Sequence, residues 1–306
     1  MTGTDRPGLP FTGERFTPEC QREIWYEHWH RYAFARRFAQ GKRVLDAACG
    51  EGYGSALLAD AAADVVGLDI SADAIAHARA RYAAQPRLRF ECGDAAALGF
   101  PDRSFDLVVS FETLEHLAAQ TELVAGFARV LTDEGLLLIS SPDRKAYSEV
   151  AGYQNPFHVR ELYRDELLAL LRPHFPDIRL YGQKLLFQSV LWALDGSGQG
   201  SESWTANRDG SVVEAGLAYA PLYFVALCGK VPGSGRSVAP ALSVFGDRDE
   251  TVYAHYNHEI RQNMQAGARI AQLESALRDR RNPAEAPSSP AREPDRRRWW
   301  RWWRHD

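Results

Sequence analysis

A run of strand-type residues, FDLVVSF at 105–111, ends in three side chains with chemical potential. Glu112, Glu115 and His116 follow it in the order E-x-x-E-H. An imidazole has an ordinary pKa of about 6.5, which suits a general base that removes a hydroxyl proton. Carboxylate oxygens and imidazole nitrogens also bind divalent cations, and a bound cation makes a hydroxyl more acidic. The motif therefore predicts either a catalytic site built on His116 and Glu115 or a metal site.

A glycine-rich turn, DAACGEGYG at 46–54, follows an earlier strand-type run. Gly50, Gly52 and Gly54 have no Cβ, so a ligand can approach the main-chain NH groups there. The dinucleotide fingerprint is G-x-G-x-x-G, a spacing that this turn does not have. Asp46 stands just before the glycines, where a carboxylate repels a pyrophosphate and suits a cationic ligand. These residues favour a nucleoside site over a dinucleotide site.

Two further acids follow the next two strand-type runs. Asp69 ends the run in VVGLDIS, and Asp94 follows the run in ECGDAAAL. Taken singly, each acid is equally well explained as a turn or loop cap. An acid at the end of a second parallel strand can accept hydrogen bonds from both hydroxyls of a ribose. Three acids in this order would lie at neighbouring strand ends, and their joint use depends on the resemblance described below.

The elements that must position these residues alternate along the chain. Helical patterns separate five strand-type runs, at 43–48, 64–69, 88–92, 105–111 and 135–141. This alternation predicts βαβ units and an α/β fold whose mostly parallel sheet is covered by helices on both faces.

Local signals predict where two of the helices begin. Ser71 and Thr113 are the candidate N-caps. A helix that begins near Thr113 would place Glu112, Glu115 and His116 on one face.

VLDAACGEGYG resembles the first motif of class I S-adenosylmethionine-dependent methyltransferases. The resemblance implies a Rossmann-like, seven-stranded sheet and S-adenosyl-L-methionine as cofactor. Ala48 stands where the first glycine of that motif often lies, and it is small enough to allow close approach. The resemblance implies cofactor contacts from these residues: Asp46, Ala48, Gly50, Gly52, Asp69, Ile70, Asp94, Ala95 and Phe111.

The E-x-x-E-H motif resembles that of small-RNA 2′-O-methyltransferases and ubiquinone-biosynthesis O-methyltransferases, in which these residues are associated with a divalent cation. His158, in NPFHVREL, stands where the former have a further histidine. The resemblance therefore implies a site for a cation such as Mg²⁺ at Glu112, Glu115, His116 and His158. In the alternative interpretation, Glu115 and His116 only hydrogen-bond the loop that carries His158.

The methyl acceptor is predicted from resemblance alone. Bacterial methyltransferase domains with NPFHVRELY-like segments suggest a hydroxyl of a sugar or glycan, or of another small acceptor. Tyr153, Asn155, His158 and Arg160 would hold it. A quinone or other lipid phenol is an alternative acceptor. A different class of hypothesis is a non-catalytic scaffold that recruits partners through a C-terminal helix.

Composition changes divide the chain. Residues 1–40 contain an aromatic helix, in which Trp25 and Tyr32 are candidates to close over a sulfonium. Residues 41–232 form the predicted methyltransferase domain, interrupted by a Gly/Ser-rich insertion at 195–211 that is expected to be a surface loop.

Two segments follow the domain. Residues 247–281 read as a helix or short coiled coil, which predicts possible self-association. Residues 282–306 form a predicted disordered linker and an Arg/Trp-rich tail. The tail is a candidate anchor to a membrane surface, where arginine and tryptophan are favoured, or to a protein partner.

Composition excludes several classes of protein. The 306 residues are 45% hydrophobic and 25% charged, with a formal net charge of -4, so no overall field favours nucleic acid. No stretch approaches the roughly 18 consecutive apolar residues of a membrane span. The four cysteines, Cys20, Cys49, Cys92 and Cys228, form no C-x-x-C pair, and the first residues do not resemble a signal peptide. These features predict a cytoplasmic protein, with a possible peripheral position at the inner membrane surface.

Overall fold

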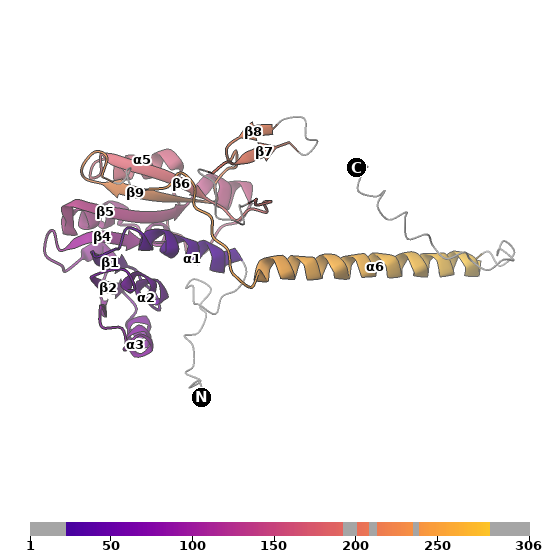
Figure 1. Cartoon of the computed structure of the whole chain (residues 1–306), viewed down its shortest axis with the longest axis horizontal. Coiled ribbons are helices and arrows are strands. Elements are labelled where there is room, and N and C mark those ends of the chain that lie inside the picture. The colour runs from indigo at the N-terminus through magenta and orange to yellow at the C-terminus, as the bar shows by residue number, and fades with distance from the viewer. Residues whose placement is uncertain (1–22, 192–200, 208–212, 235–238, 282–306) are drawn as a thin grey trace. The chain divides into compact units, whose positions relative to one another are not determined.

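The computed structural model describes residues 23–191, 201–207, 213–234 and 239–281 (Figure 1). Contacts divide the chain into two compact units, residues 1–248 and 249–306. The N-terminal segment before residue 23 and the predicted linker and tail at 282–306 lie outside the described residues, as does most of the predicted insertion.

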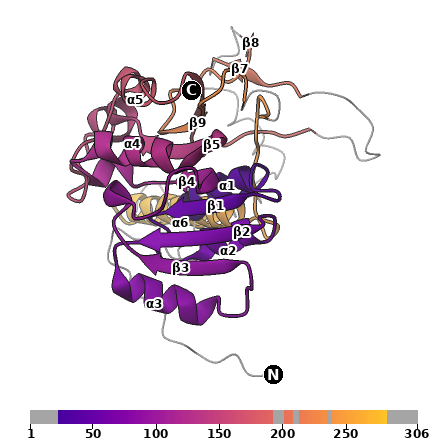
Figure 2. The ribbon, with the colours of Figure 1, turned by 90° about the vertical axis from the view of Figure 1, so that its left-hand side faces the viewer.

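The first unit is built on a seven-stranded sheet in the order β3-β2-β1-β4-β5-β9-β6 (Figure 2). β1 to β5 are parallel, and β9 runs antiparallel to both of its neighbours, β5 and β6. The prediction of a Rossmann-like, seven-stranded, mostly parallel sheet is confirmed. The strands are β1 (Arg43–Ala47), β2 (Asp64–Asp69), β3 (Leu88–Cys92), β4 (Phe105–Ser110), β5 (Leu131–Pro142), β6 (Asp177–Gln183) and β9 (Tyr223–Gly229).

Alternate strand residues bury their side chains on opposite faces of the sheet, as the two-residue period of a strand requires. Val44 of β1 joins the core cluster that contains α1 and α2, whereas its neighbour Leu45 joins the cluster that contains α4 and α5. Ser71 caps α3, because its Oγ accepts a hydrogen bond from the backbone NH of Ala74. The five helices are α1 (Glu23–Arg36), α2 (Tyr53–Ala59), α3 (Ala72–Arg81), α4 (Gln120–Val130) and α5 (Arg164–Leu171).

One local prediction was wrong. The helix expected from Thr113 does not form there: Leu114–His116 is a single 3₁₀ turn, η2, and α4 begins only at Gln120. Glu112 has a positive φ of 50° and Thr113 makes no capping hydrogen bond, so the backbone is not helical at this point. Within the predicted insertion, β7 (Trp204–Ala206) pairs in a short antiparallel ladder with β8 (Val213–Ala215), which follows it.

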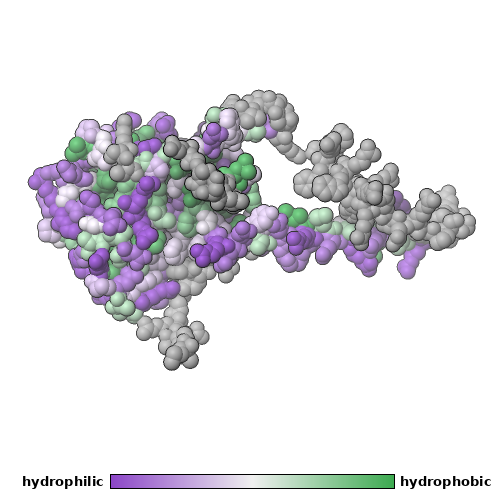
Figure 3. Space-filling model, in the orientation of Figure 1, coloured by the Kyte–Doolittle hydropathy of each residue, from purple (hydrophilic) through white to green (hydrophobic). Residues whose placement is uncertain are grey.

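The second unit contains α6 (Thr251–Arg281), the helix predicted for this region. Hydrophilic side chains cover most of its visible face in Figure 3. Several apolar side chains are nevertheless exposed on it, among them Ile260, Ile270 and Leu277. Within the described residues, no helix combines the length and apolar character needed to cross a membrane.

Candidate functional site

The glycine-rich turn connects β1 to α2 through left-handed backbone conformations. Ala48, Gly50 and Gly52 have φ values of 63°, 57° and 91°. A Cβ at Gly52 would lie 2.6 Å from the Phe90 ring, and one at Gly54 would collide with the Tyr32 ring. The last two glycines are therefore required by packing within the protein as well as by any ligand. Ala48 adopts a conformation that costs an L-residue energy.

Asp46 lies beneath this turn and is fully buried. Its carboxylate accepts hydrogen bonds from the Tyr32 hydroxyl, at 3.0 Å, and from the Ser55 hydroxyl, at 2.6 Å. Burial raises the pKa of Asp46 to about 7, because the two hydrogen bonds only partly offset its desolvation. In this arrangement Asp46 ties α1 and α2 to the first strand and has no face open to solvent.

The other two acids lie at the carboxyl ends of β2 and β3, next to the glycine turn. One oxygen of Asp69 accepts a hydrogen bond from the Gly50 NH and the other from the Ser71 NH, each at 2.8 Å. Exposed Asp94 accepts from the Ala96 NH, at 2.8 Å, and so caps the 3₁₀ turn η1 (Ala95–Ala97). The parallel register of β2 and β3 places both acids at one sheet edge.

Apolar residues complete this edge. Ile70 directly follows Asp69 and leaves 73% of its side chain exposed, which is unusual for isoleucine and leaves an apolar face for a ring. Phe111, after β4, is buried edge-on against Tyr32, with ring centroids 5.1 Å apart. The edge thus offers a carboxylate for ribose hydroxyls and an apolar surface for a base, and it fits S-adenosylmethionine.

Glu112 contacts Arg31 and Ser140 and is not part of the group formed by His116 and His158. Its Oε1 lies 3.2 Å from Nη1 of the buried Arg31 and accepts a hydrogen bond from the Ser140 hydroxyl at 2.7 Å. Its own NH donates to the same hydroxyl at 2.9 Å. The sequence did not predict this ion pair between Glu112 and Arg31. The one signal was that Glu27 and Arg31, two residues of opposite charge, lie one turn apart on the helix expected to cover the cofactor pocket.

Glu115, His116 and His158 come together, with one ligand atom from each within 4.8 Å of the others. Glu112 is not part of this group, which corrects the four-residue metal set predicted from the sequence. His116 Nδ1 donates to the Phe157 carbonyl at 3.1 Å, so the neutral ring carries its lone pair on Nε2. This hydrogen bond is the contact that the alternative interpretation predicts between His116 and the loop that carries His158.

Glu115 joins that loop contact through its main chain, because its carbonyl accepts from the Val159 NH at 2.8 Å and from the Arg160 NH at 3.0 Å, while its side chain takes no part. Its carboxyl is 1% exposed, and neither oxygen has a hydrogen-bond partner among the described residues. Burial first, and the charge of Glu112 second, hold its pKa well above the usual range. An ionised carboxylate without a hydrogen-bond partner is costly to bury, so this site favours the protonated form of Glu115.

His158 is less available to a cation. Its Nδ1 pairs with Glu161 at 2.6 Å and its Nε2 accepts from the Asn155 amide at 3.0 Å. Either nitrogen must give up a protein partner before it binds an ion. The donor set fits a divalent cation, with this rearrangement of His158 as its condition. Tyr153 and Arg160, the other predicted acceptor residues, are exposed beside this loop.

Comparisons with known proteins find a methyltransferase domain in the part of the chain that contains this edge. Residues 45–139 match a family described as a methyltransferase domain. A "probable S-adenosylmethionine-dependent methyltransferase" of Mycolicibacterium smegmatis is 43% identical over 166 residues, which are 53% of this chain and 63% of that protein. A protein of the same description from Mycobacterium tuberculosis is 40% identical over 178 residues, 57% of this chain and 64% of the relative. The chain thus spans less than two thirds of the length of these relatives.

Among solved structures, the YcgJ protein of Bacillus subtilis is 18% identical, with a TM-score of 0.48 over 67% of this chain and all of that one. The sheet order, the glycine turn and the family match are together those of an α/β methyltransferase domain over residues 45–139. The relatives that this chain resembles are described as S-adenosylmethionine-dependent methyltransferases.

Proposed function

We propose that this protein transfers a methyl group from S-adenosylmethionine to a hydroxyl of a sugar, glycan or other small acceptor. The observation that carries the proposal is the juxtaposition at one sheet edge of the Asp69 and Asp94 strand ends with η2, which bears Glu115 and His116. Bound there, the cofactor supplies an electrophilic methyl on a sulfonium. The chemistry it would supply is in-line transfer of that carbon to the acceptor oxygen, with the electron pair of the carbon–sulfur bond left on sulfur.

His116 is the residue we assign to the acceptor proton. The Phe157 carbonyl holds Nδ1–H, so Nε2 presents the lone pair that can accept a proton from a hydroxyl. Glu115 Oε1 lies 3.9 Å from Nε2 and can stabilise the imidazolium once it forms. This stabilisation requires Glu115 to ionise, which its raised pKa opposes until the positive ring is present.

A divalent cation at Glu115, His116 and His158 is the second way to lower the pKa of the hydroxyl. Direct binding of Mn²⁺, followed by electron paramagnetic resonance, tests it without an activity assay. We expect Glu115→Gln to abolish binding, while His258→Ala on exposed α6 leaves it unchanged. If the wild-type protein binds no Mn²⁺, the cation is excluded and His116 acts alone.

Calorimetry with S-adenosylhomocysteine tests the cofactor site, and labelled S-adenosylmethionine incubated with extracts of the native host identifies the acceptor. We expect a stoichiometric binding isotherm and transfer of label to a hydroxyl compound. Absence of heat on titration would remove the enzyme and leave the scaffold hypothesis.

A second acceptor class has its own support. Relatives over about a third of the chain include a demethylmenaquinone methyltransferase of Renibacterium salmoninarum, 36% identical, and a fatty-acid O-methyltransferase of Mycolicibacterium smegmatis, 38% identical. Those descriptions favour a quinone or lipid acceptor as the alternative. Label that partitions into the organic phase of a host extract would select it.

A further inference from the structure

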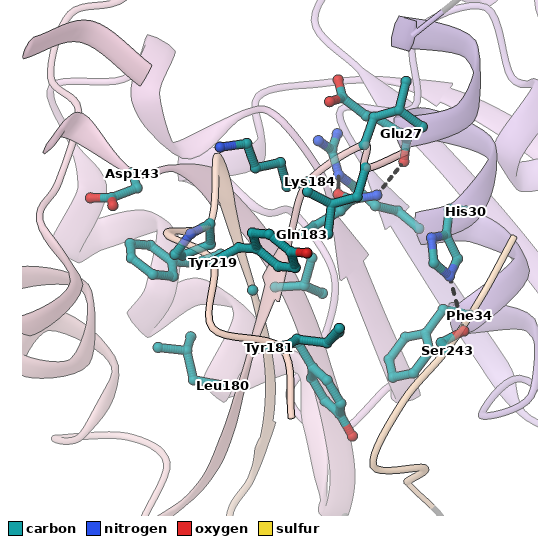
Figure 4. Close-up of a pocket in the computed structure, with 18 of the residues that line it drawn as sticks. Glu27, His30, Phe34, Asp143, Leu180, Tyr181, Gln183, Lys184, Tyr219 and Ser243 are labelled. Atoms are coloured by element: carbon teal, nitrogen blue, oxygen red, sulfur yellow. Dashed lines mark hydrogen bonds between the residues drawn. The ribbon is translucent and has the colours of Figure 1, made fainter. Parts of the chain in front are cut away.

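A cavity of about 810 Å³ lies beside Arg31, and its lining does not include Glu112. Residues of α1 line it together with β6, the start of β9, and the segments 217–221 and 241–245. Figure 4 shows Glu27, His30 and Phe34 along one wall and Asp143 on the opposite side. Its volume lies within the roughly 300–1,000 Å³ of small-molecule sites. No predicted site residue lines it.

The inner wall of this cavity is polar and held in place. Arg31 donates from Nε to Gln183 at 2.7 Å, and the Gln183 amide donates to the Glu27 carbonyl at 2.9 Å (Figure 4). The Arg31 guanidinium stacks over the Tyr223 ring, 4.5 Å from its centroid. Arg31 is 2% exposed, yet its Nη2 has no hydrogen-bond partner among the described residues. A buried donor of this kind lacks an acceptor that a ligand oxygen can supply.

The charge around Arg31 favours an uncharged ligand. Glu112 pairs with the guanidinium at 3.2 Å and Glu27 lies near it, so the positive charge of Arg31 is already offset. The other charged residues of the lining are of both signs: Asp143, Lys145, Arg164, Asp165 and Lys184. An anion that reached Nη2 would lie close to the Glu27 carboxyl, which also lines the cavity. A hydroxyl meets both groups, because its oxygen accepts from Arg31 while its proton is donated to Glu27.

The remaining walls are rich in aromatic rings. They come from separate parts of the fold, and His30 is fixed among them by a hydrogen bond to Ser243, at 2.9 Å, and by stacking on Phe245. Burial and the neighbouring Arg31 lower the pKa of His30, which keeps it neutral and so adds no attraction for anions. Flat rings cover the apolar CH face of a sugar ring while its hydroxyls meet the polar wall. The rings are Tyr26, Phe34, Tyr163, Tyr181, Tyr219, Phe224 and Phe245.

Side-chain contacts connect this cavity to the proposed transfer centre. The ring of Tyr223, which lies under Arg31, has its centroid 5.7 Å from that of Tyr147. The Tyr147 ring stacks on His158, with ring centroids 5.4 Å apart. Arg31 itself joins the cavity to Glu112. The contacts from the cavity to His158 therefore run through three side chains, those of Arg31, Tyr223 and Tyr147.

We propose that the cavity beside Arg31 is a binding subsite for a neutral sugar unit of the acceptor, distinct from the unit that is methylated. That the bound sugar belongs to the methyl acceptor rests on the proposed function, whereas sugar binding itself can be measured independently of methyl transfer. It implies that the acceptor is an oligosaccharide or a glycoside and not an isolated phenol.

A glycan array probed with the labelled full chain tests the subsite. We expect binding to uncharged oligosaccharides, weakened at least tenfold by Tyr219→Ala, because that ring lines the cavity on an exposed segment where the change leaves the core intact. Tyr253→Ala, an exposed tyrosine of α6, is the matched control and should bind as wild type does.

Three results would overturn the subsite: no binding to any glycan, preference for sulfated or phosphorylated glycans, or equal binding by Tyr219→Ala and wild type. Titration of the same samples with S-adenosylhomocysteine separates the two proposals. A protein that binds this ligand but no glycan loses the subsite and keeps the methyltransferase. A protein that binds glycans but not this ligand has the opposite outcome.

Discussion

Glu27 makes the protein less stable as the pH rises, and Glu27→Gln should remove that effect. The side chain is 8% exposed, and desolvation raises its pKa from 4.5 to about 7. Between those values the folded state holds a proton that the unfolded state has released. Stability from this group is therefore fully present below pH 4.5 and is lost as the pH approaches 7. A shift from 4.5 to about 7, at 1.36 kcal/mol per unit, amounts to about 3 kcal/mol.

Urea unfolding followed by tryptophan fluorescence, at a series of pH values from 4.5 to 8, measures the effect. Glutamine keeps a polar group of the same size, and Arg31 keeps Glu112 as its partner. We expect the unfolding free energy of the variant to fall by about 3 kcal/mol less than that of wild type across this range. Buried Asp46 adds a slope of its own, but it does so in both proteins and cancels in the difference.

The exposed Glu134→Gln is the matched control, and its curve should parallel that of wild type. Parallel curves for Glu27→Gln and wild type would refute the reasoning, because they would mean that Glu27 ionises in the folded protein as easily as in the unfolded chain.

Three more outcomes are expected. Asp69→Ala removes the acceptor of the Gly50 NH and the carboxylate assigned to the ribose, so S-adenosylhomocysteine should bind about 10–100-fold more weakly in calorimetry. Asp73→Ala, at an exposed position, is the control. Equal affinities of Asp69→Ala and wild type would contradict the site. Gly54→Ala presses a methyl group against the Tyr32 ring and should lower the unfolding free energy by about 1–3 kcal/mol; an unchanged Tm would show that the contact relaxes without cost. The exposed apolar residues of α6 are proposed to pair two copies of the chain, so light scattering should give a dimer for the full chain and a monomer after removal of residues 249–306; a monomer in both cases would end that idea.

Much of the cofactor edge could be predicted from the sequence because its signals are local. The alternation of strands and helices, the glycine turn after β1 and the acids that end β2 and β3 are all patterns of a few neighbouring residues. A parallel sheet then brings the carboxyl ends of these strands to one edge whatever the distant side chains do. For that reason Asp69, Asp94 and Ile70 lie together as expected.

The second half of the site was decided by tertiary structure. The sequence places Glu112 three residues before Glu115, and a helix would have aligned them, but the left-handed backbone at Glu112 and the 3₁₀ turn after it separate them. Glu112 then pairs with Arg31, 81 positions earlier, while the Glu115 carboxyl has no hydrogen-bond partner among the described residues and lies 3.9 Å from His116 Nε2.

The sequence by itself therefore determined the fold class of this protein and the strand-end residues of the proposed nucleoside-binding edge. Only the tertiary structure showed that Glu112 pairs with Arg31 and that the Glu115 carboxyl has no hydrogen-bond partner among the described residues. It also showed the cavity beside Arg31. The physical reason is that a buried charge takes the partner that packing brings within reach, and the alternation of residues along a chain does not record that partner.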